Sequence, residues 1–97
     1  MAEQSLRERD AAALELTEAI RQSDRYLSSH NPSVRIIKQK ISKISDKAEA
    51  FKHTHFNHCR VAKIEITSET AITYFNSQLD AAEDGSDRAL LHIDTQE

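Results

Sequence analysis

The amino-acid sequence predicts an all-α protein, a small antiparallel bundle of three main helices in a single domain over residues 1–97. Helix-breaking residues are almost absent, since the chain has one glycine, Gly85, and one proline, Pro32. Apolar residues recur at steps of three and four along most of the chain, which is the period of one helix face. A chain of 97 residues builds only a modest core, so we expect oligomerisation to be able to complete it.

The first helix is predicted over residues 4–28. Its apolar seam repeats every seven residues. It comprises Leu6, Ala13, Ile20 and Leu27, with Leu16 joining it and Ala12, Ala19 and Tyr26 flanking it. The polar Arg9 and Ser23 lie at intervening seam positions. These interruptions favour a helix of a bundle over a long independent coiled coil.

The second helix is predicted over residues 32–61, with Asn31 as the N-cap and Pro32 at the first helical position. Its apolar stripe consists of Ile37, Ile41, Ile44, Ala48 and Phe51, and continues in register through His55, His58 and Ala62. A stripe of this length must be buried against another helix, in the same chain or in another copy. A short connection is expected near residues 62–67.

The third helix is predicted over residues 68–83, with Thr67 or Ser68 as its cap. Its core stripe comprises Ala71, Ile72, Phe75, Leu79 and Ala82. Gly85 then lies in an acidic cluster and costs a helix interior about 1 kcal/mol. We therefore expect a kink there, or a fourth short helix over residues 86–93.

The seams of the three helices define the residues expected to pack the core. Any of them that stays exposed is expected to form an interface with a partner. The set is Leu16, Ile20, Ile37, Ile41, Ile44, Phe51, Ile72, Phe75 and Leu79.

Charge is unevenly distributed along the chain, whose net charge is −3. Residues 31–63 carry eight basic and two acidic side chains, whereas residues 64–97 carry one basic and eight acidic side chains. The favoured interpretation is that neighbouring helices of opposite charge fix each other's pairing. The alternative is a phosphate-binding surface on the middle helix, made by Arg35, Lys38, Lys40, Lys43, Lys47 and Lys52. No aromatic residues alternate with these side chains, which argues against base stacking.

A cluster of histidines near the end of the second helix is the most reactive chemistry in the chain. Candidate metal ligands are His55, His58 and Cys59, because His55 lies one helical turn from both of the others. A closed zinc site needs four ligands, and no familiar pair of ligand pairs is present. The favoured interpretation is that these histidines lie at the seam near one end of the bundle, where mild acid would loosen it.

Several classes of function are excluded by what the sequence lacks. A single glycine cannot form a phosphate-binding loop and no nucleophile elbow is present, so we expect no enzymatic activity, no cofactor and no small-molecule substrate. No apolar run is long enough to span a membrane, and no secretion signal is evident. With its single cysteine, Cys59, the chain fits a reducing compartment, so an intracellular, cytoplasmic location is the default expectation.

The chain also resembles a known family. The resembling residues are Leu16, Thr17, Ile20, Lys40, Ile41, Ile44, Phe51, His55, Tyr74 and Phe75. They follow the order seen in the N-terminal helical, Gag-like region of Pao/BEL-type LTR-retrotransposon polyproteins. The resemblance implies a structural role, namely self-association and assembly around RNA without catalysis.

Together these observations predict a non-enzymatic helical module for protein–protein interaction or oligomerisation. Self-association or a protein partner is expected. One alternative is a nucleic-acid-binding module that uses the basic middle helix. A second alternative is a small metal-binding regulator that uses the histidines and the cysteine.

Overall fold

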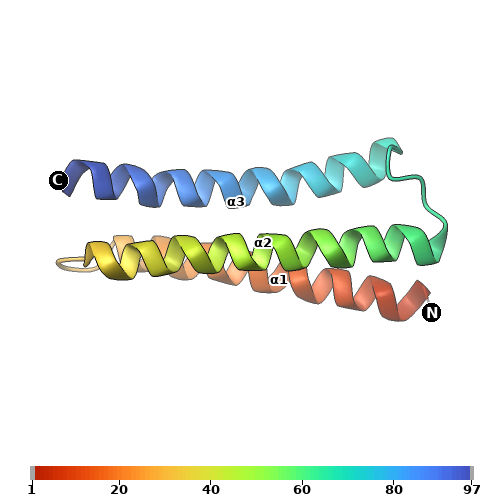
Figure 1. Ribbon diagram of the computed structural model, residues 1–97, viewed down its shortest axis with the longest axis horizontal. Helices are drawn as coiled ribbons and strands as arrows, with labels where there is room; N and C mark the ends of the chain where they lie inside the picture. The colour runs from red at the N-terminus through yellow and green to blue at the C-terminus, as the bar shows by residue number, and fades with distance from the viewer. Residues whose placement is uncertain (1, 97) are drawn as a thin grey trace.

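The computed structural model describes residues 2–96, with the side chains of residues 3–95, and these residues form three α-helices and no strand. The helices are α1 (Ala2–Leu27), α2 (Val34–Ala62) and α3 (Glu69–Gln96). Figure 1 shows that the chain reverses direction at both connections, so that the three helices run alongside one another. The bundle measures 48 × 22 × 15 Å. The all-α prediction is confirmed.

The turn between α1 and α2 differs from the predicted capping. Asn31 adopts a left-handed conformation with φ of 57°, and Ser33 is the N-cap of α2. The backbone N–H of Ser33 donates a hydrogen bond to the hydroxyl of Tyr26 (2.8 Å), and helical hydrogen bonding begins where Ile37 N–H donates to the Ser33 carbonyl (2.9 Å). The side chain of Tyr26 therefore holds Pro32 in the turn, ahead of the helix.

The connection between α2 and α3 covers residues 63–68. Lys63 ends α2 in a left-handed conformation with φ of 56°, and Ile64 N–H donates to the Cys59 carbonyl, which is the Schellman pattern without its usual glycine. Ser68 begins α3, because its hydroxyl accepts a hydrogen bond from Ala71 N–H (3.4 Å).

The third helix does not break at Gly85, contrary to the expected kink or fourth short helix over residues 86–93. It continues as one helix to Gln96. Gly85 is buried, and a Cβ at this position would lie 2.9 Å from Cγ2 of Ile20. The glycine therefore lets α3 approach α1 closely, and packing on both sides of it outweighs its low helix propensity.

The core forms two clusters along the bundle. The larger cluster is built around Leu16, Ile44 and Phe51 with several alanines, and the smaller is built around Ile37, Ala89 and Ile93. Ile20, Ile41, Phe75 and Leu79 are partly buried and pack against these clusters. Alanines at helix contacts allow the axes to lie close together.

Two details of the predicted seams differ from the structure. Ala71 and Ala82 of the predicted α3 stripe are buried, but Ile72 is 40% exposed, because the buried face of α3 is centred on Ala71, Ala82 and Ala89. The buried stripe of α1 keeps Ala13 and Leu16 of the predicted seam with its flanking Ala12 and Ala19, and it is completed by Ser5 and Ser23. Leu6, by contrast, is 36% exposed.

Candidate interaction surface

A groove runs between α2 and α3, and we name it the α2–α3 groove. It encloses about 360 Å³. Its lining comes from α2 and α3 alone and comprises Ile44, Ser45, Ala48, Lys52, Leu79, Ala82, Glu83 and Ser86. Its floor is apolar, and two side chains of opposite charge lie along it. Such a surface suits the apolar face of another helix.

The apolar character of the groove continues beyond its ends. Ile72 and Leu90 lie seven residues before Leu79 and seven after Glu83, so all four share one face of α3. On α2, Phe56 lies four residues after Lys52 and prolongs the same face. Phe56, Ile72 and Leu90 are 41%, 40% and 48% exposed. The exposed apolar stripe therefore extends past both ends of the α2–α3 groove.

The polar contacts between helices all involve α1 within residues 3–95. Lys47 pairs with Glu15 (3.0 Å) and links α2 to α1. The guanidinium of Arg88 donates to both oxygens of Asp24 (3.0 and 2.9 Å) and links α3 to α1. No ion pair joins basic α2 to acidic α3 in the part of the chain that the structure describes, so the expected charge pairing between these two neighbours is absent.

The six predicted phosphate contacts do not form one surface. Lys40, Lys43 and Lys47 recur at steps of three and four on the side of α2 that faces α1. Lys43 donates to Gln22 (3.3 Å) and Lys47 pairs with Glu15, both on α1. The other three predicted contacts, Arg35, Lys38 and Lys52, lie on other faces of α2.

Aromatic rings close one end of the α2–α3 contact around His55. The His55 ring is 1% exposed and lies 4.8 Å from the ring of Phe75 and 5.8 Å from that of Phe51. Its Nδ1 has no hydrogen-bond partner within residues 3–95. Burial lowers the pKa of His55 below its usual value of 6.5, and the nearby charges of Arg9 and His58 lower it further. Protonation of the imidazole is therefore disfavoured in the folded chain.

The predicted metal ligands do not converge. His55 Nε2 lies 3.7 Å from Cys59 Sγ, whereas His58 turns to α1, where its Nδ1 shares a hydrogen bond with Ser5 Oγ (2.9 Å). Among the described residues, no group of three or more His, Cys, Asp or Glu side chains is placed to hold a metal ion. The structure thus gives the metal-binding interpretation no site.

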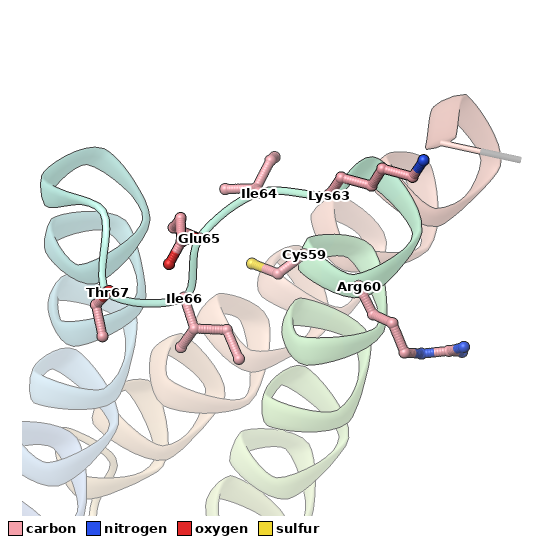
Figure 2. A pocket seen from close by; sticks show the side chains of 7 residues that line it. All are labelled: Cys59, Arg60, Lys63, Ile64, Glu65, Ile66 and Thr67. Atoms are coloured by element: carbon pink, nitrogen blue, oxygen red, sulfur yellow. The ribbon is translucent and has the colours of Figure 1, made fainter.

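A second hollow, of about 420 Å³, lies under the connection between α2 and α3. It is lined by Cys59, Arg60, Lys63, Ile64, Glu65, Ile66 and Thr67. Figure 2 shows the Cys59 sulfur facing the connection, whereas the side chains of Arg60 and Lys63 extend away from it. These two cations therefore do not converge on the thiol.

Comparison with known proteins adds no assignment to this geometry. No family model matches the chain, and no curated protein or solved structure shows significant similarity to it. Among the described residues, no helix combines the length and apolar character needed to cross a membrane.

The sequence predicted only part of this surface. Ile44 and Leu79 were predicted as core or interface residues, and Ala48 and Ala82 belonged to the predicted helix stripes. Lys52 was predicted as a phosphate contact. Ser45, Glu83 and Ser86 were missed, because short polar residues do not stand out on a helical wheel. The available signal was the recurrence of Ile44, Ala48 and Lys52 at steps of four along α2.

Proposed function

We propose that this protein is a non-enzymatic self-association module whose contact surface is the α2–α3 groove. The observation that carries the proposal is the apolar floor of the groove, continued by exposed apolar side chains at both ends. Exposed apolar stripes of this kind mark sites where proteins bind one another. Pairing of opposite charges at the rim would orient the contact.

The α2–α3 groove can be blocked without touching the core. Ser45 lines the groove but is exposed, so Ser45→Glu leaves the interior of the bundle unchanged. A carboxylate buried in the contact without a partner would weaken self-association at least tenfold. Ala50→Glu is the matched control, because Ala50 is exposed on the same helix and does not line the groove.

Light scattering over a range of concentrations tests the proposal. We expect the wild-type chain and Ala50→Glu to shift together from monomer to dimer or larger species, and Ser45→Glu to stay monomeric. A wild-type chain that remains monomeric up to high concentration would overturn the proposal. Equal behaviour of the two variants would place the contact elsewhere on the molecule.

Self-association is also the role implied by the resemblance to the Gag-like region of Pao/BEL-type polyproteins, which stays a prediction. Binding of nucleic acid is the competing proposal, and salt separates the two. Phosphate contacts weaken steeply as ionic strength rises, whereas association through an apolar groove changes little.

A further inference from the structure

We infer that the occupant of the α2–α3 groove is the same groove of a second copy of this chain. In this arrangement the basic α2 of each copy lies along the acidic α3 of the other. The inference rests on the proposed function, because it takes the groove to be the surface of self-association. It goes further by fixing which helix meets which and in what register.

The charges of α2 and α3 decide which helix of the second copy each of them contacts. Helix α2 carries seven basic and two acidic side chains, a net charge of +5, and α3 carries one basic and six acidic side chains, a net charge of −5. Contact of α2 with α3 of the second copy brings opposite charges together, whereas contact of α2 with α2 brings like charges together. Only the first arrangement is electrostatically favourable.

The charges that line the groove are available to a second copy. Within residues 3–95 no acidic side chain of α3 pairs with a lysine or an arginine, and Arg88 bonds to Asp24 of α1. Lys52 pairs with Glu49 on its own helix (3.0 Å). The side chains of this pair are 39% and 61% exposed, so the pair is weak and exchangeable.

Symmetry fixes the register. Two copies with identical contact surfaces are related by a two-fold axis, and opposite-charge pairing requires that axis to lie parallel to the helices. Such a rotation keeps every residue at its own level along the bundle. Lys52 and Glu83 line the same groove from α2 and α3. Phe51 packs against Phe75, so Glu83 lies about two helical turns along the groove from Lys52. Side chains lean towards the N-terminus of their own helix, and in antiparallel helices this brings Lys52 and Glu83 towards each other. The rotation therefore places the Lys52 side chain of each copy along the groove towards Glu83 of the other, giving two equivalent pairs.

The surface area is consistent with a dimer of ordinary size. The chain exposes 6442 Å², whereas a monomer of 11.0 kDa is expected to expose about 5,600 Å². The elongated shape contributes to this excess of about 800 Å², and a standard interface buries about 800 Å² on each partner. The small side chains of Ala48 and Ala82 along the groove allow the two copies to approach closely.

Charge reversal tests this register directly. Lys52→Glu places a carboxylate opposite Glu83 of the second copy, and Glu83→Lys places an ammonium group opposite Lys52. We expect each variant alone to dimerise at least tenfold more weakly than the wild-type chain, because like charges then face each other twice. An equimolar mixture of the two variants restores both pairs, so we expect a heterodimer of wild-type affinity.

Light scattering of each variant alone, and native mass spectrometry of the mixture, measure the two effects. The matched control is Lys43→Glu, which makes the same change on the side of α2 that bonds to Gln22 of α1. We expect Lys43→Glu to dimerise like the wild-type chain and to show no preference for Glu83→Lys in a mixture. Thermal melts followed by circular dichroism confirm that all three variants fold.

The outcomes separate this inference from the proposed function. A dimeric wild-type chain that Ser45→Glu disrupts, but whose charge-reversed variants do not prefer each other, would overturn the register and leave the groove as the contact surface. A monomeric wild-type chain would overturn both. Restoration by mixing cannot arise from contacts within one chain, because each variant still carries two like charges in its own groove.

Discussion

The contacts of α1 differ in kind from the contact between α2 and α3. Helix α1 is joined to α2 by the pair of Lys47 with Glu15, and to α3 by Arg88 with Asp24 and by the close approach at Gly85. Within residues 3–95, helices α2 and α3 meet through apolar and aromatic side chains. The α2–α3 groove lies over the larger core cluster, which contributes Ile44, Ala48, Leu79 and Ala82 to its lining. The difference indicates that polar contacts of α1 hold the other two helices in place, while α2 and α3 leave an exposed groove between them.

Opposite net charge on adjacent helices did not produce ion pairs between them. The positions of α2 and α3 that face each other are occupied by short or apolar residues such as Ala48, Leu79 and Ala82. The charged residues lie further out on each helix, where Lys52 reaches Glu49 and not α3. Charge patterning along a sequence therefore indicates which helices attract, but the facing positions decide whether pairs form within the chain or between copies.

The largest loss of stability is expected from a change among the aromatic rings that close one end of the α2–α3 contact. Phe51 is fully buried, and its ring lies 5.8 Å from that of Tyr74 and 6.0 Å from that of Phe75. Phe51→Ala leaves a cavity, which we expect to lower the free energy of unfolding by about 4 kcal/mol. Urea unfolding followed by circular dichroism measures it, and in so small a domain the variant would be largely unfolded at 37 °C.

Phe56→Ala is the control for this change. Phe56 belongs to the same aromatic group, with its ring 5.2 Å from that of Phe75, but it is 41% exposed. Its removal is expected to cost about 1 kcal/mol, because much of its surface already contacts water. A loss as large as that of Phe51→Ala would show that the end of the contact is packed more tightly than the structure indicates.

A smaller loss of stability is expected from a substitution at Gly85, where α3 approaches α1 closely. Gly85→Ala raises helix propensity by about 1 kcal/mol, but its Cβ would overlap Cγ2 of Ile20, a β-branched side chain with little freedom to move. Overpacking of this kind costs about 2 kcal/mol, so we expect a net loss of stability of about 1 kcal/mol. Chemical denaturation measures the net change.

A double-mutant cycle sharpens that test. In an Ile20→Ala background the obstructing methyl groups are gone, so Gly85→Ala should become stabilising by up to about 1 kcal/mol. The reversal of sign would show that the glycine is required for the approach of the two helices. Stabilisation in both backgrounds would show that α3 can move away from α1 at little cost.

The three helices could be predicted from sequence because their apolar stripes and the turn residues around Pro32 are local signals. The stripe of α2 is the clearest case, since Ile37, Ile44 and Phe51 are all buried. The continuity of α3 through Gly85 could not be predicted, because it depends on Ile20, which lies 65 residues earlier in the chain. Local propensity indicated a break where a contact with another helix required a glycine.

The candidate surface was harder to predict than the core. Its lining combines residues from two helices, and neither helix alone shows that Lys52 and Glu83 lie along one groove. The buried stripe of α1 was predicted in part, since Ala13 and Leu16 are buried whereas Leu6 is 36% exposed. The stripe begins and ends in Ser5 and Ser23, which are 4% and 1% exposed. Apolar periodicity gives no signal for Ser5, and it counted Ser23 as an interruption of the seam.

The smallest expected effect is a dependence of stability on pH, caused by His55 at the aromatic end of the α2–α3 contact. The pKa of His55 is lowered from 6.5 by burial and by Arg9 and His58, and Cys59 and Tyr74 also face the ring. The unfolded chain binds a proton at about pH 6.5 and the folded chain resists it, so stability is complete above pH 6.5 and falls as the pH drops below it. We expect the melting temperature to decrease from pH 7.5 to about pH 5.5, a range around that reference value.

Replacing the imidazole isolates its contribution to that decrease. His55→Phe keeps an aromatic ring among Phe51 and Phe75 and removes the titrating group, so we expect its melting temperature to depend less on pH than that of the wild-type chain. His53→Phe is the matched control, because His53 is exposed on the same helix, and it should keep the wild-type pH dependence. An unchanged pH dependence in His55→Phe would assign the acid sensitivity to another group. In that case a neutral His55 would contribute to the closed end of the α2–α3 contact through packing alone, like the phenylalanines around it.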